Sequence, residues 1–321
     1  MPPRTVEVSA PSRLHFGLFS FGGGERQFGG VGVVVEKPGL RLRGTTASAF
    51  DARGPLAGRV REFAERWATF HGLPKLPPCL VEVVQAPPDH VGLGTGTQLG
   101  LSVAAALNAF CEFPSSTPVE LAISVGRGLR SAVGTYGFCG GGLVVERGKS
   151  VSDPISPLEC RLDLPADWRF VLLTPAGFTG LSGSEEQKAF SGLPRVDPSV
   201  SECLIAEVRT RMVPAAARGD FNQFSESVYE FGRASGLCFS EKQGGPYNGP
   251  VLTALVESIR NMGVRGVGQS SWGPTIFAIF PNELEANRFV REFEEKWRDM
   301  AKLTMVVTPA SNGGAKVEVR G

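Results

Sequence analysis

The sequence lacks paired cysteines, clustered histidines and long apolar runs, and each absence excludes a class of protein. Its six cysteines are scattered without any CxxC pair, so neither a disulfide framework nor a cysteine-based zinc site is expected. The three histidines lie far apart and give no metal-ligand spacing. No run approaches the roughly 20 apolar residues that span a bilayer, and the first residues contain no apolar signal core. We therefore expect a cytoplasmic protein with reduced thiols.

The chain also lacks an excess of charge of either sign. Thirty-three Lys and Arg residues balance 32 Asp and Glu residues, which gives a formal net charge of +1. This balance produces no summed field that would favour nucleic acid or a membrane surface. We expect neither as a partner, so any basic site must be local.

The hydrophobic pattern predicts an α+β architecture. With 321 residues, 42% of them hydrophobic, the chain can bury a large core, and two closely packed domains are expected. Near Asp167 the pattern restarts, which predicts a boundary between residues 1–166 and residues 167–321. Strands of one sheet are predicted over 6–9, 31–36, 40–43, 80–84 and 142–146, and helices over 58–71, 98–111 and 119–130.

The strongest signal for a ligand is the loop HVGLGTGTQ, residues 90–98, between a predicted strand and a predicted amphipathic helix. Its glycines allow close approach of the backbone, and the amides at the helix start favour phosphate oxygens. A tight turn without a ligand is the alternative. The GxxxxGK(S/T) and GxGxxG spacings are both missing, so P-loop and Rossmann folds are not expected. The predicted phosphate or pyrophosphate contacts are Gly92, Gly94, Thr95, Gly96, Thr97 and Gln98, and Thr97 is also a candidate ligand of Mg²⁺.

Two further segments have the composition of a binding site. PSRLHFGL, residues 11–18, follows the first predicted strand and brings Arg13 and His15 together, with Arg26 farther along. Arginine and histidine near a glycine-rich turn suit an anion-binding wall, although a solvated basic face would have the same composition. GVGQSSWGPT, residues 266–275, places hydrogen-bonding side chains beside two glycines at a strand mouth, which suits either a ligand clamp or a plain turn. Its candidate residues are Gln269, Ser270, Ser271 and Trp272.

Taken in order, the loops SRLHFGL, GLGTGTQ and GVGQSSWGPT resemble the three motifs of the GHMP-kinase superfamily over nearly the whole chain. The segments HVGLGTGTQ, RSAVGTYGF (residues 130–138) and GQSSWGPT resemble one branch of it, β-ribofuranosylaminobenzene 5′-phosphate synthase. The resemblance implies a GHMP-kinase fold with a ribosomal-protein-S5-like N-terminal domain and a C-terminal ferredoxin-like αβ sandwich. It also implies a site at the domain junction and a homodimer.

The chemistry implied by this resemblance joins phosphoribosyl pyrophosphate to 4-aminobenzoate, or to a related hydroxy- or aminobenzoate, with loss of CO₂ and pyrophosphate. The reaction belongs to the biosynthesis of methanopterin-type C1 carriers. The enzyme would stabilise the leaving pyrophosphate and align the reactants, and it would need no strong acid or base. Mg²⁺ is the expected cofactor. Arg13, His15, Gln269 and Ser270 are the predicted catalytic residues, and Arg26, Ser271, Trp272 and Tyr247 are the predicted substrate contacts.

Two weaker assignments and two rival functions remain open. Glu185 is a candidate Mg²⁺ ligand, whereas Arg127 and Arg130 are interpreted as solvated charges near a helix C-terminus. A GHMP kinase that phosphorylates a small alcohol is the first rival. Such kinases often place an aspartate base where this chain reads SAVGT, residues 131–135, which weakens that alternative. A non-catalytic protein that binds a nucleotide or phosphoribosyl pyrophosphate is the second.

Overall fold

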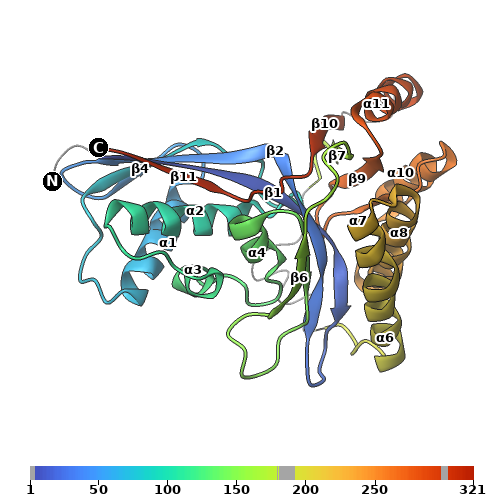
Figure 1. Ribbon diagram of the computed structural model, residues 1–321, viewed down its shortest axis with the longest axis horizontal. Helices are drawn as coiled ribbons and strands as arrows, with labels where there is room; N and C mark the ends of the chain where they lie inside the picture. The colour runs from blue at the N-terminus through green and yellow to red at the C-terminus, as the bar shows by residue number, and fades with distance from the viewer. Residues whose placement is uncertain (1–3, 179, 181–191, 298–302) are drawn as a thin grey trace.

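The computed structural model describes residues 4–178, 180, 192–297 and 303–321. Within these residues, two mostly antiparallel sheets lie side by side, each covered by helices (Figure 1). The larger sheet has seven strands in the order β11-β1-β2-β4-β3, with β5 and β6 continuing from β2, and the smaller sheet has the order β10-β7-β9-β8. The mostly antiparallel α+β fold predicted from the sequence is therefore confirmed.

The strands of the larger sheet are β1 (Thr5–Ser20), β2 (Phe28–Thr46), β3 (Asp51–Arg53), β4 (Cys79–Gln85), β5 (Leu143–Glu146), β6 (Leu158–Leu162) and β11 (Lys316–Arg320). Those of the smaller sheet are β7 (Arg169–Pro175), β8 (Val267–Gln269), β9 (Ile276–Phe280) and β10 (Leu303–Pro309). The helices are α1 (Ala57–Phe70), α2 (Thr95–Phe110), α3 (Pro118–Ser124), α4 (Val133–Gly140), α6 (Pro198–Glu207), the π-helix η1 (Val208–Met212), α7 (Val213–Arg218), α8 (Phe221–Leu237), α9 (Ser240–Gln243), α10 (Pro250–Asn261) and α11 (Glu283–Trp297).

The hairpin of β1 and β2 is much longer than the sequence predicted. The predicted strands 31–36 and 40–43 are one strand, β2, and the segment 11–18 lies inside β1 instead of following it. The register between the two strands shifts between Ala10 and Ser12 and again between His15 and Gly17. These irregularities interrupt the period-2 pattern and let the strand bend. The hairpin thereby reaches from the larger sheet to α8, where Ser235 Oγ donates to the carbonyl of Leu18.

Three of the four hydrophobic cores among the described residues hold these layers together. One lies between the larger sheet and helices α1, α2 and α3. Alternate residues of β7 supply the other two, because successive side chains on a strand point to opposite faces. Phe170 and Leu172 join the core that contains α6 and α8, whereas Val171 and Leu173 join the core beneath α10 and α11. The smaller sheet is thus covered on both faces, which fixes its position beside the hairpin.

The predicted helix over 119–130 ends early, at Ser124. Gly126 and Gly128 both adopt positive φ, 65° and 79°, a conformation that glycine reaches without strain and that stops the helix. Residues 125–132 instead form a loop that leads into α4. Arg127 and Arg130 are therefore loop residues, and their interpretation as charges of a helix surface is wrong.

The larger sheet draws strands from both ends of the chain. β6 is the last strand of the larger sheet before β7 opens the smaller one, yet β11 returns to pair with β1, from Thr5↔Arg320 to Ser9↔Lys316. Thr5 and Arg320, from opposite ends of the described chain, consequently lie side by side in the larger sheet (Figure 1). Within the described ranges, no helix has the length and apolar character needed to cross a membrane.

Candidate functional site

The three loops singled out in the sequence meet at one point, and Ser270 ties them together. Its buried hydroxyl accepts a hydrogen bond from the amide of His15 at 3.0 Å and donates one to the carbonyl of Gly92 at 2.6 Å. Arg13 also donates to Gly92 O, at 2.9 Å, and the amide of Ser271 donates to His15 O at 3.0 Å. The segments 11–18, 90–98 and 266–275 are therefore held in one fixed arrangement.

Two adjoining cavities open around this junction, with volumes of about 750 and about 400 Å³. The smaller one lies at the glycine-rich loop, and the larger one extends toward α8 and the loop before α10. Residues that line both cavities form the passage between them: Arg13, Thr97, Arg127, Arg130, Ser271 and Trp272.

The wall of the smaller cavity is the N-terminus of α2. Gly94 precedes the helix in the left-handed conformation, with φ 74° and ψ 17°. The first amides of a helix have no partner within it, and the helix dipole adds partial positive charge at this end. Gly96 in the first turn has no side chain, and a Cβ there would collide with the guanidinium groups of Arg59 and Arg127. The glycines thus leave room for two cations directly beside the start of the helix.

These arginines make the smaller cavity strongly cationic. Burial lowers the pKa of Arg127 to about 10, and repulsion from Arg59, Arg66 and Arg130 acts in the same direction, opposed by Asp89. Arg59 forms an ion pair with Asp89. Nε of Arg127 is buried and has no hydrogen-bond partner among the described residues. Several guanidinium groups beside a helix N-terminus, with one carboxylate to offset them, form a site for a polyanion.

Sequence reasoning missed Arg59, Arg66, Arg127 and Arg130 as cavity residues. Arg59 and Arg66 lie on α1, and their sequence gives no sign that they face a site. For Arg127 and Arg130 a usable signal was present, because glycine at 126 and 128 interrupts the helical pattern. Two glycines that end a helix next to arginines indicate a loop, and arginine side chains on a loop can face a cavity instead of solvent.

The far end of the larger cavity is apolar and aromatic. Phe239 and Trp272 pack edge to face, with ring centroids 4.8 Å apart and an interplanar angle of 75°. Tyr247 is 3% exposed, and its buried hydroxyl has no hydrogen-bond partner in the described part of the chain. Tyr247 and Trp272, which also reaches the passage, are predicted substrate contacts, and both line this cavity on a surface suited to a planar ring. Gln269 also lines this cavity, with its amide bonded to Ser271 O and Asn248 N.

A buried polar chain leads from this cavity into the protein. His15 is 4% exposed, and its Nε2 lies 3.0 Å from Ser131 Oγ. Beyond Ser131 lies the carboxyl group of Glu146, whose Oε2 accepts from the amide of Ala132 at 2.6 Å and whose buried Oε1 has no hydrogen-bond partner among the described residues. Burial raises the pKa of Glu146 to about 7, and the polar groups of Ser131 and Ala132 oppose the shift. Burial and nearby Arg13 lower the pKa of His15 to about 3, so its ring is neutral at physiological pH.

Some predicted phosphate contacts lie at the loop but direct their side chains elsewhere. Gln98 is buried and donates to the carbonyl of Gly134 at 3.1 Å, away from both cavities. The hydroxyl of Thr95 donates to Pro88 O at 3.0 Å, so this residue offers its amide to a ligand instead. Thr97 lines both cavities. Ser270 is fully buried and acts by positioning the loops, without facing either cavity.

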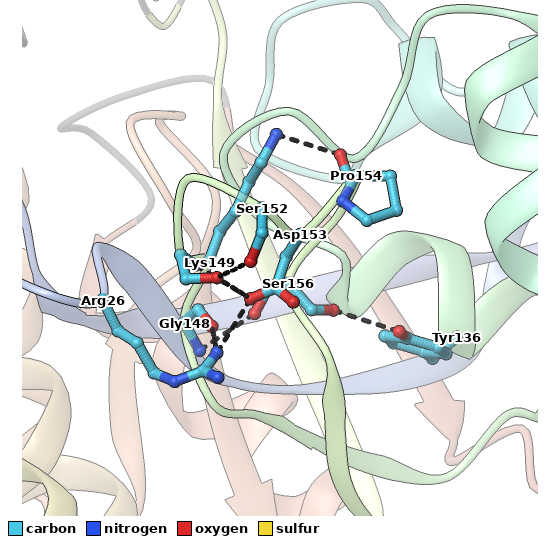
Figure 2. A network of polar contacts seen from close by, with 9 residues as sticks. Arg26, Tyr136, Gly148, Lys149, Ser152, Asp153, Pro154 and Ser156 are labelled. Carbon is cyan, nitrogen blue, oxygen red and sulfur yellow. Dashed lines mark hydrogen bonds and ion pairs between the residues drawn. The ribbon is translucent and has the colours of Figure 1, made fainter.

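Arg26 is not among the residues that line either cavity. Figure 2 shows its guanidinium group in a network on the outer side of the hairpin, where it donates to Gly148 O at 2.8 Å and to Asp153 Oδ2 at 2.9 Å. Tyr136 bonds to Ser156 O in the same network. The long hairpin carries Arg26 beyond the site, so its prediction as a substrate contact is corrected.

The described residues contain no group of three or more His, Cys, Asp or Glu side chains placed to hold a metal ion. Glu185, the predicted second Mg²⁺ ligand, lies outside the described residues. Magnesium in phosphate sites is commonly held by one or two carboxylates together with substrate oxygens. Asp89 and Thr97 on the smaller cavity are the donors that fit this use.

The chain is similar to known proteins in both sequence and fold. The model of the GHMP kinases C terminal family matches residues 212–299. The chain is similar to the beta-ribofuranosylphenol 5'-phosphate synthase of Methanothermobacter thermautotrophicus, with 30% identity over 85% of this chain and 88% of the relative. The protein of the same name from Archaeoglobus fulgidus is 28% identical, over 98% and 100% of the two chains.

Solved structures share the fold at low sequence identity. Homoserine kinase from Cytophaga hutchinsonii superposes with a TM-score of 0.68 at 16% identity, covering 98% of this chain and 97% of its own. Mevalonate diphosphate decarboxylase from Staphylococcus aureus gives 0.64 at 13% identity, covering 98% of both chains. The GHMP-kinase fold predicted from the loops is therefore confirmed.

Proposed function

The chain belongs to the beta-ribofuranosylphenol 5'-phosphate synthase family, and from this premise we propose that it joins phosphoribosyl pyrophosphate to 4-hydroxybenzoate. A ring carbon attacks ribose C1, pyrophosphate departs, and loss of CO₂ restores the aromatic ring. The enzyme is thus a ribosyl transferase with coupled decarboxylation, as in methanopterin-type C1-carrier biosynthesis.

The relatives' name argues for a phenol acceptor in place of the aniline expected first. A ribosylphenol product retains a ring hydroxyl. If the ribosyl carbon replaces the carboxylate, the acceptor that yields this product is 4-hydroxybenzoate, whereas 4-aminobenzoate would yield a ribosylaminobenzene. The hydroxybenzoate was among the acceptors considered from the sequence, and it becomes our first choice.

The cationic N-terminus of α2 is the observation that carries the proposal. Departure of pyrophosphate places several negative charges on the leaving group at the moment the bond breaks. Arg59, Arg127 and the first amides of α2 converge where those charges can be met. Donors that are fixed in place before the reaction stabilise developing charge without reorganisation.

The two cavities suit the two substrates. In our proposal, pyrophosphate occupies the smaller cavity and the ribose lies in the passage near Arg13 and Thr97. The aromatic acid then enters the larger cavity, whose far end is aromatic. Arg66 and Arg130 on the larger cavity are placed to bind the 5′-phosphate. This order brings ribose C1 and the ring carbon together at the junction, and alignment of this kind contributes roughly 7–11 kcal/mol.

A kinase function is less well supported by the residues at the site. Among the described lining residues, Asp89 is the one carboxylate, and it is paired with Arg59. At the position where kinases of this fold often carry their base, α4 begins with Val133 after Ala132. A phosphoryl transfer that requires deprotonation of an alcohol would have no carboxylate there.

Mg²⁺ remains a proposal for this chain. Asp89 and Thr97 are the residues that would hold it, together with pyrophosphate oxygens. When bound, the ion would supply charge neutralisation to the leaving group. The homodimer and the cytoplasmic location are also proposals, and gel filtration with light scattering would test the first.

Incubation of the purified protein with phosphoribosyl pyrophosphate, Mg²⁺ and carboxyl-labelled 4-hydroxybenzoate tests the proposed function. We expect CO₂ and pyrophosphate in equal amounts. A parallel incubation contains ATP and a panel of small alcohols. ADP formation there, with neither product in the first incubation, would assign the protein to the kinases instead.

A further inference from the structure

His15 lines the larger cavity and has one ring nitrogen that is outside the buried polar chain. Its Nε2 is bonded to Ser131, and the described residues provide no hydrogen-bond partner for Nδ1. His15 and Ser131 both line the larger cavity, but neither lines the smaller one. The chain from His15 to Glu146 therefore opens toward the acceptor and away from the pyrophosphate site.

The hydrogen bonds of this chain have one consistent direction. An ionised Glu146 accepts the proton of the Ser131 hydroxyl, so Ser131 Oγ accepts from Nε2–H of the neutral imidazole. This arrangement leaves a lone pair on Nδ1. A neutral histidine with that tautomer accepts a hydrogen bond from a ligand hydroxyl.

On the basis of the proposed function, we propose that His15, Ser131 and Glu146 form a proton relay that makes the site selective for a phenolic acceptor. As the ring carbon attacks ribose C1 and the bond to pyrophosphate breaks, the phenol proton passes to Nδ1. Nε2 gives its proton to Ser131, and Ser131 gives its own to Glu146. The ring of the acceptor becomes an uncharged cyclohexadienone that still carries the anionic carboxylate.

Loss of CO₂ completes the reaction with no net uptake or release of a proton. The electron pair of the broken carbon–carbon bond restores the aromatic ring and leaves a phenolate oxygen. The proton on Glu146 returns to that oxygen by the same route. The sequence-based expectation that no acid or base is needed therefore does not hold for a hydroxybenzoate.

An amine acceptor has much less need of this relay. The nitrogen lone pair of 4-aminobenzoate can assist the ring attack while both N–H bonds remain intact, and loss of CO₂ then restores the neutral amine. No proton has to leave during carbon–carbon bond formation. Loss of the relay should consequently slow turnover of the two acceptors to different extents.

The charges around Glu146 are compatible with this role. The amide of Ala132 donates to its Oε2, its Oε1 has no hydrogen-bond partner among the described residues, and the hydroxyls of Ser131 and Ser156 and the charge of Arg13 favour its ionised form. The charge of Glu146 in turn contributes to the raised pKa of Tyr136, the neighbouring phenol. A carboxyl group with a pKa of about 7 can be ionised before the attack and protonated after it.

The test compares Glu146→Gln and Ser131→Ala with the wild type on both acceptors. We expect turnover of 4-hydroxybenzoate to fall roughly 100-fold, the usual size of a general acid–base contribution, and turnover of 4-aminobenzoate to fall far less. Tyr136→Phe is the matched control, because it removes a hydroxyl near Glu146 that is outside the relay. This variant should not lower the turnover of one acceptor more than that of the other.

The pH dependence of turnover gives a second test, and the relay predicts an effect with 4-hydroxybenzoate alone. Glu146 must be ionised to accept the proton, so wild-type turnover of 4-hydroxybenzoate should rise as pH increases through about 7. Ser131→Ala should lose this rise, and Ser131→Thr, which retains a hydroxyl, should recover it. Equal losses on both acceptors, or a rise that persists in Ser131→Ala, would overturn the relay. Absence of CO₂ and pyrophosphate in the wild type would instead contradict the proposed function.

Discussion

The two adjoining cavities differ in the kind of stabilisation they offer. The smaller is walled by a helix N-terminus and guanidinium groups, whereas the far end of the larger is built from aromatic rings and a buried tyrosine hydroxyl for which the described residues provide no hydrogen-bond partner. Charge in the first suits a leaving polyanion. The second suits a planar ring, and a surface of low polarity favours loss of a carboxylate's charge as CO₂. Under the proposed function, departure of pyrophosphate takes place in the first cavity, and the acceptor binds and loses CO₂ in the second.

Removal of Arg127 should cause the largest loss, because it faces both cavities. We expect Arg127→Ala to lower kcat/KM for phosphoribosyl pyrophosphate by about 1000-fold, near the upper end for loss of one charge-stabilising donor. Steady-state kinetics measures the loss, and Arg127→Lys, which retains the charge without the fork, should recover part of it. Wild-type kinetics in Arg127→Ala would contradict the role of the smaller cavity.

A methyl group at position 96 should weaken the smaller cavity without removing any charge. The added Cβ of Gly96→Ala would displace the guanidinium groups of Arg59 and Arg127 from the helix start. We expect the Kd for pyrophosphate to rise by about tenfold to 100-fold, as measured by calorimetry. Gly58→Ala is the matched control, because a Cβ there meets nothing within 4 Å. The same Kd in both variants would mean that these arginines do not hold pyrophosphate.

At the aromatic end, the ring of Tyr247 should matter more than its hydroxyl. Tyr247→Ala removes buried surface next to the acceptor, so KM for the benzoate should rise about tenfold while KM for phosphoribosyl pyrophosphate changes little. Tyr247→Phe should stay within about twofold of wild type, because the buried hydroxyl has no described partner. A rise confined to KM for phosphoribosyl pyrophosphate would reverse the assignment of the two cavities.

Arg26 should show the smallest effect. Its guanidinium group is paired with Asp153 and is 43% exposed, so Arg26→Ala removes a surface ion pair worth about 1 kcal/mol or less. We expect kcat and both KM values to stay within about twofold of wild type. A loss of tenfold or more would return Arg26 to the site and require the hairpin to bend inward.

The sequence predicted the fold and the loops better than the charges around them. α1 lies within one residue of its predicted range at both ends, and α2 begins within three residues of its predicted start, because apolar periodicity and glycine boundaries are local signals. Contacts between distant segments leave no such signal. Arg59 and Arg127 are 68 positions apart and meet because α1 packs against α3, after which Arg127 lies, while β11 pairs with β1 from the opposite end of the chain.

The relay was likewise invisible before the fold was known. Glu146 ends a strand whose other residues are apolar, and its pairing with β2 carries it behind His15. In the sequence it is an ordinary carboxylate at a strand end. Only burial and the neighbouring Ser131 distinguish it from the other acidic residues.

A crystal structure of the protein with phosphoribosyl pyrophosphate and Mg²⁺ tests the central claim most directly. The account predicts the pyrophosphate at the N-terminus of α2, with its oxygens about 3 Å from the amides of Thr95 and Gly96, between Arg59 and Arg127. The ribose should point through the passage toward His15. Pyrophosphate bound at the aromatic end beside Tyr247 and Phe239 would contradict the account.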